Sequence, residues 1–272
     1  MTQSGTPFWK MHGAGNDFIL IDDRDETFPV DNNARVEEIA TPKYGIGSEG
    51  VILIQPSESA DFRMRFFNPD GSEVEMCGNG ARCVARLAHE QGIAPKAMHF
   101  DTVAGVIGAK IVSEDVVELA MTEPKDLELN QTLNVQDQDI TIHYVNSGVP
   151  HVVIQLDDVE ECDLQTLGAA IRYHERFAPA GTNVNIIEVL GPDHLKVRTY
   201  ERGVEAETLA CGTGIVASGI VAGSLGLVST PVTVTCASGD TLLVNYHQGE
   251  AGPESATLTG PAVHVFSGQI VL

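Results

Sequence analysis

Short runs of alternating or β-branched hydrophobic residues recur along the chain and predict a protein dominated by β-strands. Glycine, proline, asparagine and aspartate, which favour turns, separate these runs. The clearest runs are DFILID at 17–22, EGVILIQ at 49–55, FRMRFF at 62–67, ITIHYV at 140–145, VNIIEV at 184–189, HLKVRTY at 194–200 and VTVTC at 232–236.

Longer segments with the spacing of helices are fewer. They are NARVEEIAT at 33–41, GARCVARLAHEQG at 80–92, DLQTLGAAIRYHERF at 163–177 and GTGIVASGIVAGSLG at 212–226. The last segment is apolar on almost every side, which is typical of a buried helix. Its internal glycines disfavour a helix unless surrounding strands must approach it closely. We therefore predict an α+β fold in which this helix lies inside a curved sheet.

The two halves of the chain repeat one order of patterns. HGAGNDFILID at 12–22 is echoed by SGVPHVVIQLD at 147–157, and FRMRFFNPDGSEVEMCGNGARCVA at 62–85 by LKVRTYERGVEAETLACGTGIVAS at 195–218. We predict two similar domains related by a pseudo-twofold axis, at 1–124 and 125–262, with a C-terminal strand at about 263–272 returning to the first. The alternative is a chance resemblance between β-rich segments.

Charge and composition argue against several classes of partner. The formal net charge is −22 and no basic patch is visible, so a nucleic-acid partner is not expected. No apolar run approaches the roughly 18 residues of a membrane span. The first residues, MTQSGTPFWK, lack the features of a signal peptide. We expect a globular, cytoplasmic protein that uses neither a membrane nor nucleic acid.

The five cysteines form an odd set with no C-x-x-C pair, which argues against a disulfide framework. The nine histidines do not supply close ligand pairs either, so we expect no metal. A lone cysteine is most often a small buried hydrophobe. We expect this packing role for Cys83, Cys162 and Cys236.

Cys77 and Cys211 differ because each precedes a glycine turn that opens a helix, in EMCGNGARC at 75–83 and LACGTGIVAS at 209–218. The positive end of the helix dipole and the first helical N–H groups then face the sulfur. This setting lowers the pKa of a thiol and makes thiolate accessible near neutral pH. Both thiols can therefore act as acid and base.

The backbone amides that follow each cysteine form a nest for an anion such as a carboxylate. If the α-carbon of a bound carboxylate lies between two thiols, one thiol removes the α-hydrogen and the other delivers a proton to the opposite face. The pattern predicts inversion of configuration. The amides in question belong to Gly78, Asn79 and Gly80 and to Gly212, Thr213 and Gly214.

No cofactor is indicated. Neither cysteine motif contains a lysine for a pyridoxal Schiff base, and there is no G-x-G-x-x-G turn in a βαβ unit. The carbanion must then be stabilised electrostatically by helix-end amides in a dry pocket. Cysteine suits such a pocket, because the neutral thiol is cheap to bury and the thiolate there is strongly basic.

Together the motifs resemble those of the diaminopimelate epimerase family, cofactor-independent racemases of lysine and peptidoglycan precursor biosynthesis. The resemblance extends along the whole chain. It is carried by KMHGAGNDF at 10–18, FNPDGSEVEMCGNGARC at 67–83, GVPH at 148–151, GTNVN at 181–185 and YERGVEAETLACGTG at 200–214.

The resemblance implies two α+β domains, each a curved, mostly antiparallel sheet wrapped around a central helix, with the active site in the cleft between them. It implies conversion of LL-2,6-diaminopimelate to the meso form and back. Cys77 is then the proton donor and Cys211 the acceptor in the LL-to-meso direction. Family members are commonly homodimers, so a homodimer is expected.

Further site residues follow from the same resemblance. His151 and Glu201 match polar catalytic residues that help to set the protonation of the thiols. Asn16, Asn68, Asn183, Glu201 and Arg202 match substrate contacts, alongside Gly78, Asn79, Gly212 and Thr213 of the two nests. Arg202 is the natural partner for the distal carboxylate of the substrate.

Two positions depart from the pattern of many family members. Gly50 stands where a glutamine often contacts the substrate, and Val149 stands where GNPH would place an asparagine. At both positions we expect backbone or water to replace the distal polar contact.

The same sequence admits three alternatives. A proline or hydroxyproline racemase of the same architecture also uses two opposed cysteines, although a cyclic imino acid has no distal zwitterion for Arg202 to bind. A thiol redox enzyme would cycle Cys77 and Cys211 through a disulfide. A non-enzymatic binding module would need neither thiol.

Overall fold

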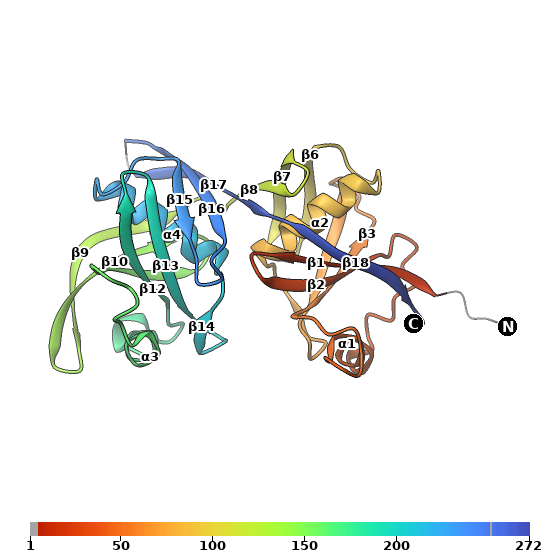
Figure 1. Ribbon diagram of the computed structural model, residues 1–272, viewed down its shortest axis with the longest axis horizontal. Coiled ribbons are helices and arrows are strands. Elements are labelled where there is room, and N and C mark those ends of the chain that lie inside the picture. The colour runs from red at the N-terminus through yellow and green to blue at the C-terminus, as the bar shows by residue number, and fades with distance from the viewer. Residues whose placement is uncertain (1–4, 251) are drawn as a thin grey trace. The chain divides into compact units, whose positions relative to one another are not determined.

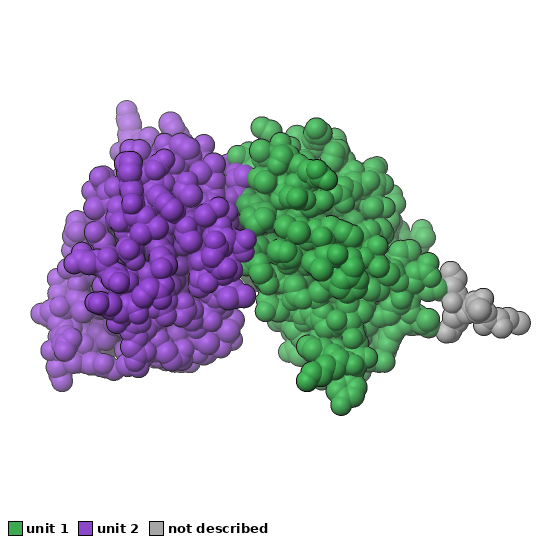
Figure 2. All heavy atoms as spheres, viewed as in Figure 1, with its two compact units in different colours: residues 1–119, 260–272 green, residues 120–259 purple. Residues whose placement is uncertain are grey.

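The computed structural model describes residues 5–250 and 252–272, which form a mixed, sheet-dominated α+β fold with few helices (Figure 1). The α+β class predicted from the sequence is confirmed. The chain falls into two compact units, coloured separately in Figure 2. Unit 1 comprises Met1–Leu119 and Gly260–Leu272, and unit 2 comprises Ala120–Thr259.

Unit 1 is built on one sheet with the strand order β18–β1–β2–β3–β4–β6–β7–β8, and β5 pairs beside β4. Its C-terminal strand β18 pairs with β1. The elements are β1 (Thr6–Gly13), β2 (Asn16–Asp22), α1 (Asn33–Ala40), β3 (Val51–Gln55), β4 (Phe62–Phe67), β5 (Glu73–Val74), α2 (Gly78–Glu90), β6 (Ala97–Thr102), β7 (Gly105–Ser113), β8 (Val116–Ala120) and β18 (Val263–Ile270).

Unit 2 repeats this arrangement as β9–β10–β11–β12–β13–β15–β16–β17, with β14 beside β13. Parallel and antiparallel pairs follow in the same sequence as in unit 1. The elements are β9 (Lys125–Val135), β10 (Gln138–Asn146), β11 (Pro150–Gln155), α3 (Leu164–Arg172), the 3-10 helix η1 (Glu175–Phe177), β12 (Asn183–Gly191), β13 (His194–Glu201), β14 (Ala206–Thr208), α4 (Gly212–Ser224), β15 (Val232–Thr235), β16 (Thr241–Gln248) and β17 (Pro253–Pro261).

The helices lie in the crossover connections between parallel strands. The pairs β2–β3 and β11–β12 are parallel, and so are β4–β6 and β13–β15. A parallel pair needs a long connection, usually a helix, whereas an antiparallel pair needs only a tight turn. In this fold α1 and α3 occupy the first connection of each unit, and the cysteine-headed helices α2 and α4 occupy the second.

Helices cover both faces of the central strands, which explains their uninterrupted hydrophobic runs. On one face of unit 1, α1 contributes Val36 and Ile39 to a core with Val51 and Leu53 of β3. On the other face, α2 packs against β1, β2, β3 and β7. All five residues of β3 are consequently buried. Strands buried on both faces are continuously hydrophobic instead of alternating.

The predicted burial of the 212–226 helix is confirmed. In α4 every residue from Gly214 to Ala222 is buried, and strands β10–β13, β15 and β16 surround the helix. Its counterpart α2 begins at Gly78, two residues before the predicted start at Gly80. The predicted 163–177 helix is interrupted, because α3 ends at Arg172 and only the short η1 follows.

The sequence patterns missed most of the long outer hairpins. Strands β6 to β9, β16 and β17 were not predicted, whereas the C-terminal strand predicted at about 263–272 is present as β18. Many of these strands have alternating exposed and buried positions, as in β9, and contain charged residues that dilute the hydrophobic signal. Among the described residues, no helix has the length and apolarity needed to cross a membrane.

We expect Gly168→Ala in α3 to lower the free energy of unfolding by about 1–3 kcal/mol through overpacking. A Cβ at Gly168 would lie 2.5 Å from Cβ and Cγ of Tyr200, atoms fixed by the sheet. The matched control is Gly78→Ala, where a Cβ meets nothing within 4 Å and stability should stay equal or rise slightly. Urea unfolding followed by circular dichroism measures both; equal stability of the two variants would contradict the packing model.

Candidate functional site

Cys77 and Cys211 are the N-cap residues of α2 and α4. Both have extended backbones, with φ/ψ of −131°/124° and −106°/107°, and neither side chain caps its helix. Their carbonyl oxygens accept the first helical hydrogen bonds, from Ala81 N at 2.8 Å and Ile215 N at 2.9 Å. Each sulfur therefore stands at the positive end of a helix dipole, where a thiolate is stabilised.

Cys83 provides the contrast within the same motif. It lies one and a half turns into α2, has no exposed surface, and burial raises the pKa of its thiol to about 12. Such a thiol stays neutral and packs as a hydrophobe. Cys236 is also buried, and Cys162 is half-buried beside the unit 2 core.

In unit 1 the structure brings Asn16 and Asn79 to Cys77. The thiol Sγ donates to Asn16 Oδ1 at 3.5 Å, and Asn79 Nδ2 donates to the same oxygen at 3.2 Å. Asn16 begins β2, and its Nδ2 donates to the carboxylate of Glu49. Because Asn16 is held from both sides, its amide orientation is fixed next to the thiol.

A buried arginine extends this network, and the sequence patterns did not single it out. Arg82 is fully buried, its Nη2 donates to Asn79 Oδ1 at 2.8 Å, and its Nε donates to Pro261 O at 3.0 Å. The chain of contacts runs from Arg82 through Asn79 and Asn16 to Cys77. The sequence signal for Arg82 was its position three residues after Asn79, because side chains at this spacing are neighbours on a helix.

Asn68 contributes to the turn that follows β4. Its backbone N donates to Ser72 O at 2.8 Å and its Nδ2 donates to Ser72 Oγ at 3.3 Å, while Gly71 takes a left-handed φ of 82°. These contacts hold the turn that leads into β5 and Cys77.

In unit 2, Cys211 Sγ lies 3.6 Å from Thr213 Oγ1. The carbonyl of Thr213 accepts a hydrogen bond from Ser147 Oγ at 2.8 Å. The GVPH segment therefore begins directly against the first turn of α4, which places His151 on the strand that leaves this contact.

His151 is fully buried in β11, and burial together with the nearby Arg202 charge lowers its pKa to about 3. Its Nδ1 lies 3.1 Å from Asn185 Nδ2. Its Nε2 is a buried atom without a hydrogen-bond partner in the part of the chain that the structure describes. His151 is thus a neutral imidazole at physiological pH.

Asn183, Glu201 and Arg202 lie where β12 begins and β13 ends. Asn183 Oδ1 accepts from Arg202 N at 2.8 Å, and Glu201 Oε2 accepts from Thr208 Oγ1 at 2.8 Å. The guanidinium of Arg202 donates to Ala180 O at 3.1 Å, and within residues 5–250 and 252–272 it has no salt bridge to a carboxylate. Its charge is suited to an external carboxylate.

The structure explains why the Gly50 position carries no polar side chain. A Cβ at Gly50 would overlap the ring of Phe66 and lie 2.9 Å from Phe67 O. The neighbouring Glu49 instead reaches Asn16. Val149 lies in the turn after β10, where its carbonyl accepts from Ser147 N at 3.2 Å.

One arginine–glutamate pair recurs in the strand that precedes each cysteine. Arg65 donates to both carboxylate oxygens of Glu73 at 2.8 Å, and Arg198 donates to those of Glu207 at 2.8 and 2.7 Å. Each glutamate lies four residues before its cysteine. These bidentate pairs anchor β5 and β14. The sequence signal for them was that an arginine and a glutamate recur at matching places in the two repeated halves.

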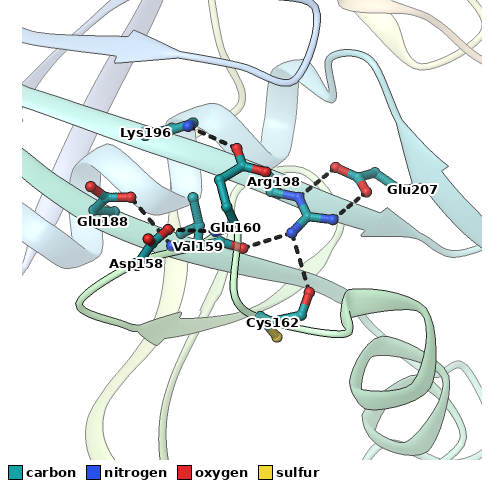
Figure 3. Close-up of polar contacts among 8 residues, drawn as sticks. All are labelled: Asp158, Val159, Glu160, Cys162, Glu188, Lys196, Arg198 and Glu207. Atoms are coloured by element: carbon teal, nitrogen blue, oxygen red, sulfur yellow. Dashed lines mark hydrogen bonds and ion pairs between the residues drawn. The ribbon is translucent and has the colours of Figure 1, made fainter.

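Figure 3 shows how Arg198 also holds the acidic loop after β11. Its Nη1 donates to the carbonyls of Val159 at 2.6 Å and Cys162 at 3.2 Å. Lys196, two residues earlier on the same strand, forms a salt bridge of 2.7 Å with Glu160. The acidic residues of this loop therefore serve the packing of unit 2.

Comparison with known proteins identifies the family. The sequence model of the diaminopimelate epimerase family matches residues 8–127 and 143–265. The chain belongs to the diaminopimelate epimerase family. It is 43% identical over 274 residues to the diaminopimelate epimerase of Aquifex aeolicus, with 97% of each chain covered. It is 41% identical to that of Chlorobaculum tepidum, with 96% of this chain and 100% of the relative covered.

Solved structures with low sequence identity share the fold of this family member. A PhzF-family protein of Bacillus anthracis has a TM-score of 0.72 at 14% identity, covering 99% of this chain and 100% of its own. A hydroxyproline epimerase of Agrobacterium vitis has a TM-score of 0.69 at 17% identity, covering 97% and 90%. The family membership makes the chain an isomerase.

We expect Glu73→Gln to lower the free energy of unfolding at neutral pH by about 1 kcal/mol, since the pair is charge-assisted but partly exposed. Arg65 holds the pKa of Glu73 below its usual 4.5, so this contribution is present above that value and disappears as the pH falls through the lower folded-state pKa. Unfolding curves of wild type and variant should converge in acid.

The control for this measurement is Glu58→Gln. Glu58 is exposed on the loop after β3, and we expect its substitution to leave stability unchanged at every pH. A wild type–Glu73→Gln difference that persists undiminished in acid would contradict the assigned pair.

Proposed function

We propose that this chain interconverts LL-2,6-diaminopimelate and meso-diaminopimelate without a cofactor, with Cys77 and Cys211 as acid and base. The observation that carries the proposal is that each of two units with the same strand order supplies a cysteine N-cap whose thiol is not used for capping. Family membership and the names of the curated relatives support the substrate.

In the proposed reaction the α-carbon of the substrate loses one proton and gains another. In the LL-to-meso direction the Cys211 thiolate takes the α-proton, and the C–H electron pair is delocalised into the carboxylate. The amides at the start of α2 and α4, including those of Gly78, Asn79, Gly212 and Thr213, stabilise that charge. The Cys77 thiol then protonates the α-carbon from the opposite face, and the two cysteines exchange roles in reverse.

The distal amino-acid end of the substrate needs a cation for its carboxylate and acceptors for its ammonium group. We assign the carboxylate to Arg202, whose charge is unpaired among the described residues. Asn16, Asn68, Asn183 and Glu201 supply amide and carboxylate oxygens. Of these, Asn16 and Asn183 are oriented by contacts with Cys77 and Arg202 respectively.

The biological setting follows from the same proposal. Family membership supports a step in the biosynthesis of lysine and peptidoglycan precursors. A cytoplasmic homodimer is the setting we infer from the resemblance of the motifs. In the proposed mechanism each unit supplies one of the two catalytic cysteines.

We expect Cys77→Ala and Cys211→Ala each to reduce epimerisation of diaminopimelate by about 100-fold or more, the range for loss of a general acid or base. The measurement is deuterium incorporation at the α-carbon in heavy water, with the stereochemistry of the product resolved. The control is Cys162→Ala, whose half-buried thiol is placed outside the site and should retain activity.

Two results would contradict the assignment of Cys77 and Cys211 as acid and base for diaminopimelate. Exchange of the α-hydrogen in proline but not in diaminopimelate would show an imino-acid racemase. Full activity in both cysteine variants would show that the thiols are not acid and base.

We expect Arg202→Met to raise the KM for diaminopimelate about 10- to 100-fold, because a hydrogen bond to a charged group contributes roughly 1.5–3 kcal/mol. The value of kcat should fall less, since Arg202 is assigned to the non-reacting end. Steady-state kinetics of epimerisation measures the split. An unchanged KM would place the distal carboxylate elsewhere.

A further inference from the structure

A buried polar triad lies beneath the first turn of α4. It consists of His151 on β11, Asn185 on β12 and Thr199 on β13, with exposed fractions of 0%, 0% and 3%. Gly214 of α4 packs directly on it, because a Cβ there would overlap Asn185 Oδ1 and lie 3.3 Å from Thr199 Oγ1. This glycine lets the helix approach the polar groups.

The contacts of Asn185 fix which way its amide points. Its Nδ2 donates to the backbone carbonyl of Val152 at 2.9 Å, and a carbonyl can only accept. Its Oδ1 accepts from Thr199 Oγ1 at 2.9 Å. The second proton of Nδ2 then faces His151 Nδ1 at 3.1 Å, which must be the accepting nitrogen. The imidazole proton consequently resides on Nε2.

The matching positions of unit 1 are apolar. Strand register aligns Phe18, Ile52 and Phe66 with His151, Asn185 and Thr199. There Phe18 and Phe66 pack edge to face at 5.7 Å, and Ile52 lies under Gly80 as Asn185 lies under Gly214. The fold does not require polar groups at this place, and burying them without full pairing costs stability. Their presence in unit 2 alone therefore points to function.

We propose that Asn185 and Thr199 are positioning residues that hold His151 as the neutral Nε2–H tautomer, so that His151 serves the bound substrate as a hydrogen-bond donor. The inference rests on the proposed epimerase function for its substrate. Nε2 is buried and has no partner among the described residues, so an oxygen of the ligand is the acceptor that would satisfy it. On this assignment His151 neither gains nor loses a proton during turnover.

The tautomer can be read directly by NMR of the full chain labelled with 15N in its histidine side chains. The His151 signals are identified as those lost in His151→Gln. We expect one protonated and one unprotonated nitrogen, with coupling patterns that assign the proton to Nε2, unchanged between pH 6 and pH 8. A proton on Nδ1, or an imidazolium at pH 7, overturns the proposal without any variant of the triad.

Variants of the triad test the positioning role. Asn185→Asp replaces the donating amide by a carboxylate, so His151 should move its proton to Nδ1 or become doubly protonated, and kcat/KM should fall about 100-fold or more. Thr199→Val should give a mixture of tautomers, whereas Thr199→Ser keeps the hydroxyl and should restore the Nε2–H form. Retention of the Nε2–H tautomer in Asn185→Asp overturns the role of Asn185.

The two readouts separate this inference from the proposed function. If His151 carries its proton on Nε2 but the protein does not exchange the α-hydrogen of diaminopimelate, the proposed epimerase function and the role of His151 as a donor to the substrate are both wrong. The positioning of His151 by Asn185 still holds in that case. Epimerase activity with the wrong tautomer removes only the inference. Thermal unfolding of each variant reports whether lost activity comes from lost structure.

Discussion

The placement of a cysteine at the N-terminus of a buried helix is the constraint on which the rest of this structure depends. The first N–H groups of such a helix have no partner within the helix itself, and here neither cysteine side chain caps them. Short strands anchored by bidentate arginine–glutamate pairs lead into each cysteine, and glycines let the following turn approach the sheet.

The two units pack a cysteine-headed helix on the sheet in the same way, but with different side chains around the start of the helix. In unit 1 the sheet beneath the helix start is hydrophobic, and the polar contacts reach the thiol from the side through Asn16, Asn79 and Arg82. In unit 2 the sheet beneath the helix start is polar, with Asn185 under Gly214 and bonded to His151, and the thiol of Cys211 contacts Thr213. A shared backbone arrangement thus supports unequal environments, which fits the opposite roles proposed for the two thiols.

Much of the fold was accessible from the sequence because its central strands are covered on both faces. Runs such as VILIQ in β3 and the all-apolar α4 carry a strong signal. The outer strands have one face in solvent, so their signal is mixed, and their pairing depends on partners far away in the sequence. The pairing of β18 with β1, for example, joins residues more than 200 positions apart.

The shared position of Cys77 and Cys211 at helix N-termini was also accessible, since their glycine-rich surroundings repeat. Residues that act through another side chain were not: Glu49, Arg82 and Asn185 are ordinary polar residues until the fold places each beside Asn16, Asn79 or His151. No local pattern distinguishes a buried asparagine that orients an imidazole from one in a turn. Only the pairing of strands β11 and β12 makes that distinction.

The return of β18 to β1 has a consequence for how the chain is made. Unit 2 is continuous from Ala120 to Thr259, whereas the sheet of unit 1 receives its edge strand β18 from residues that follow the whole of unit 2. During translation one side of β1 therefore stays unpaired until Val263–Ile270 has been synthesised, after all of unit 2. The order of synthesis and the order of completion run in opposite directions.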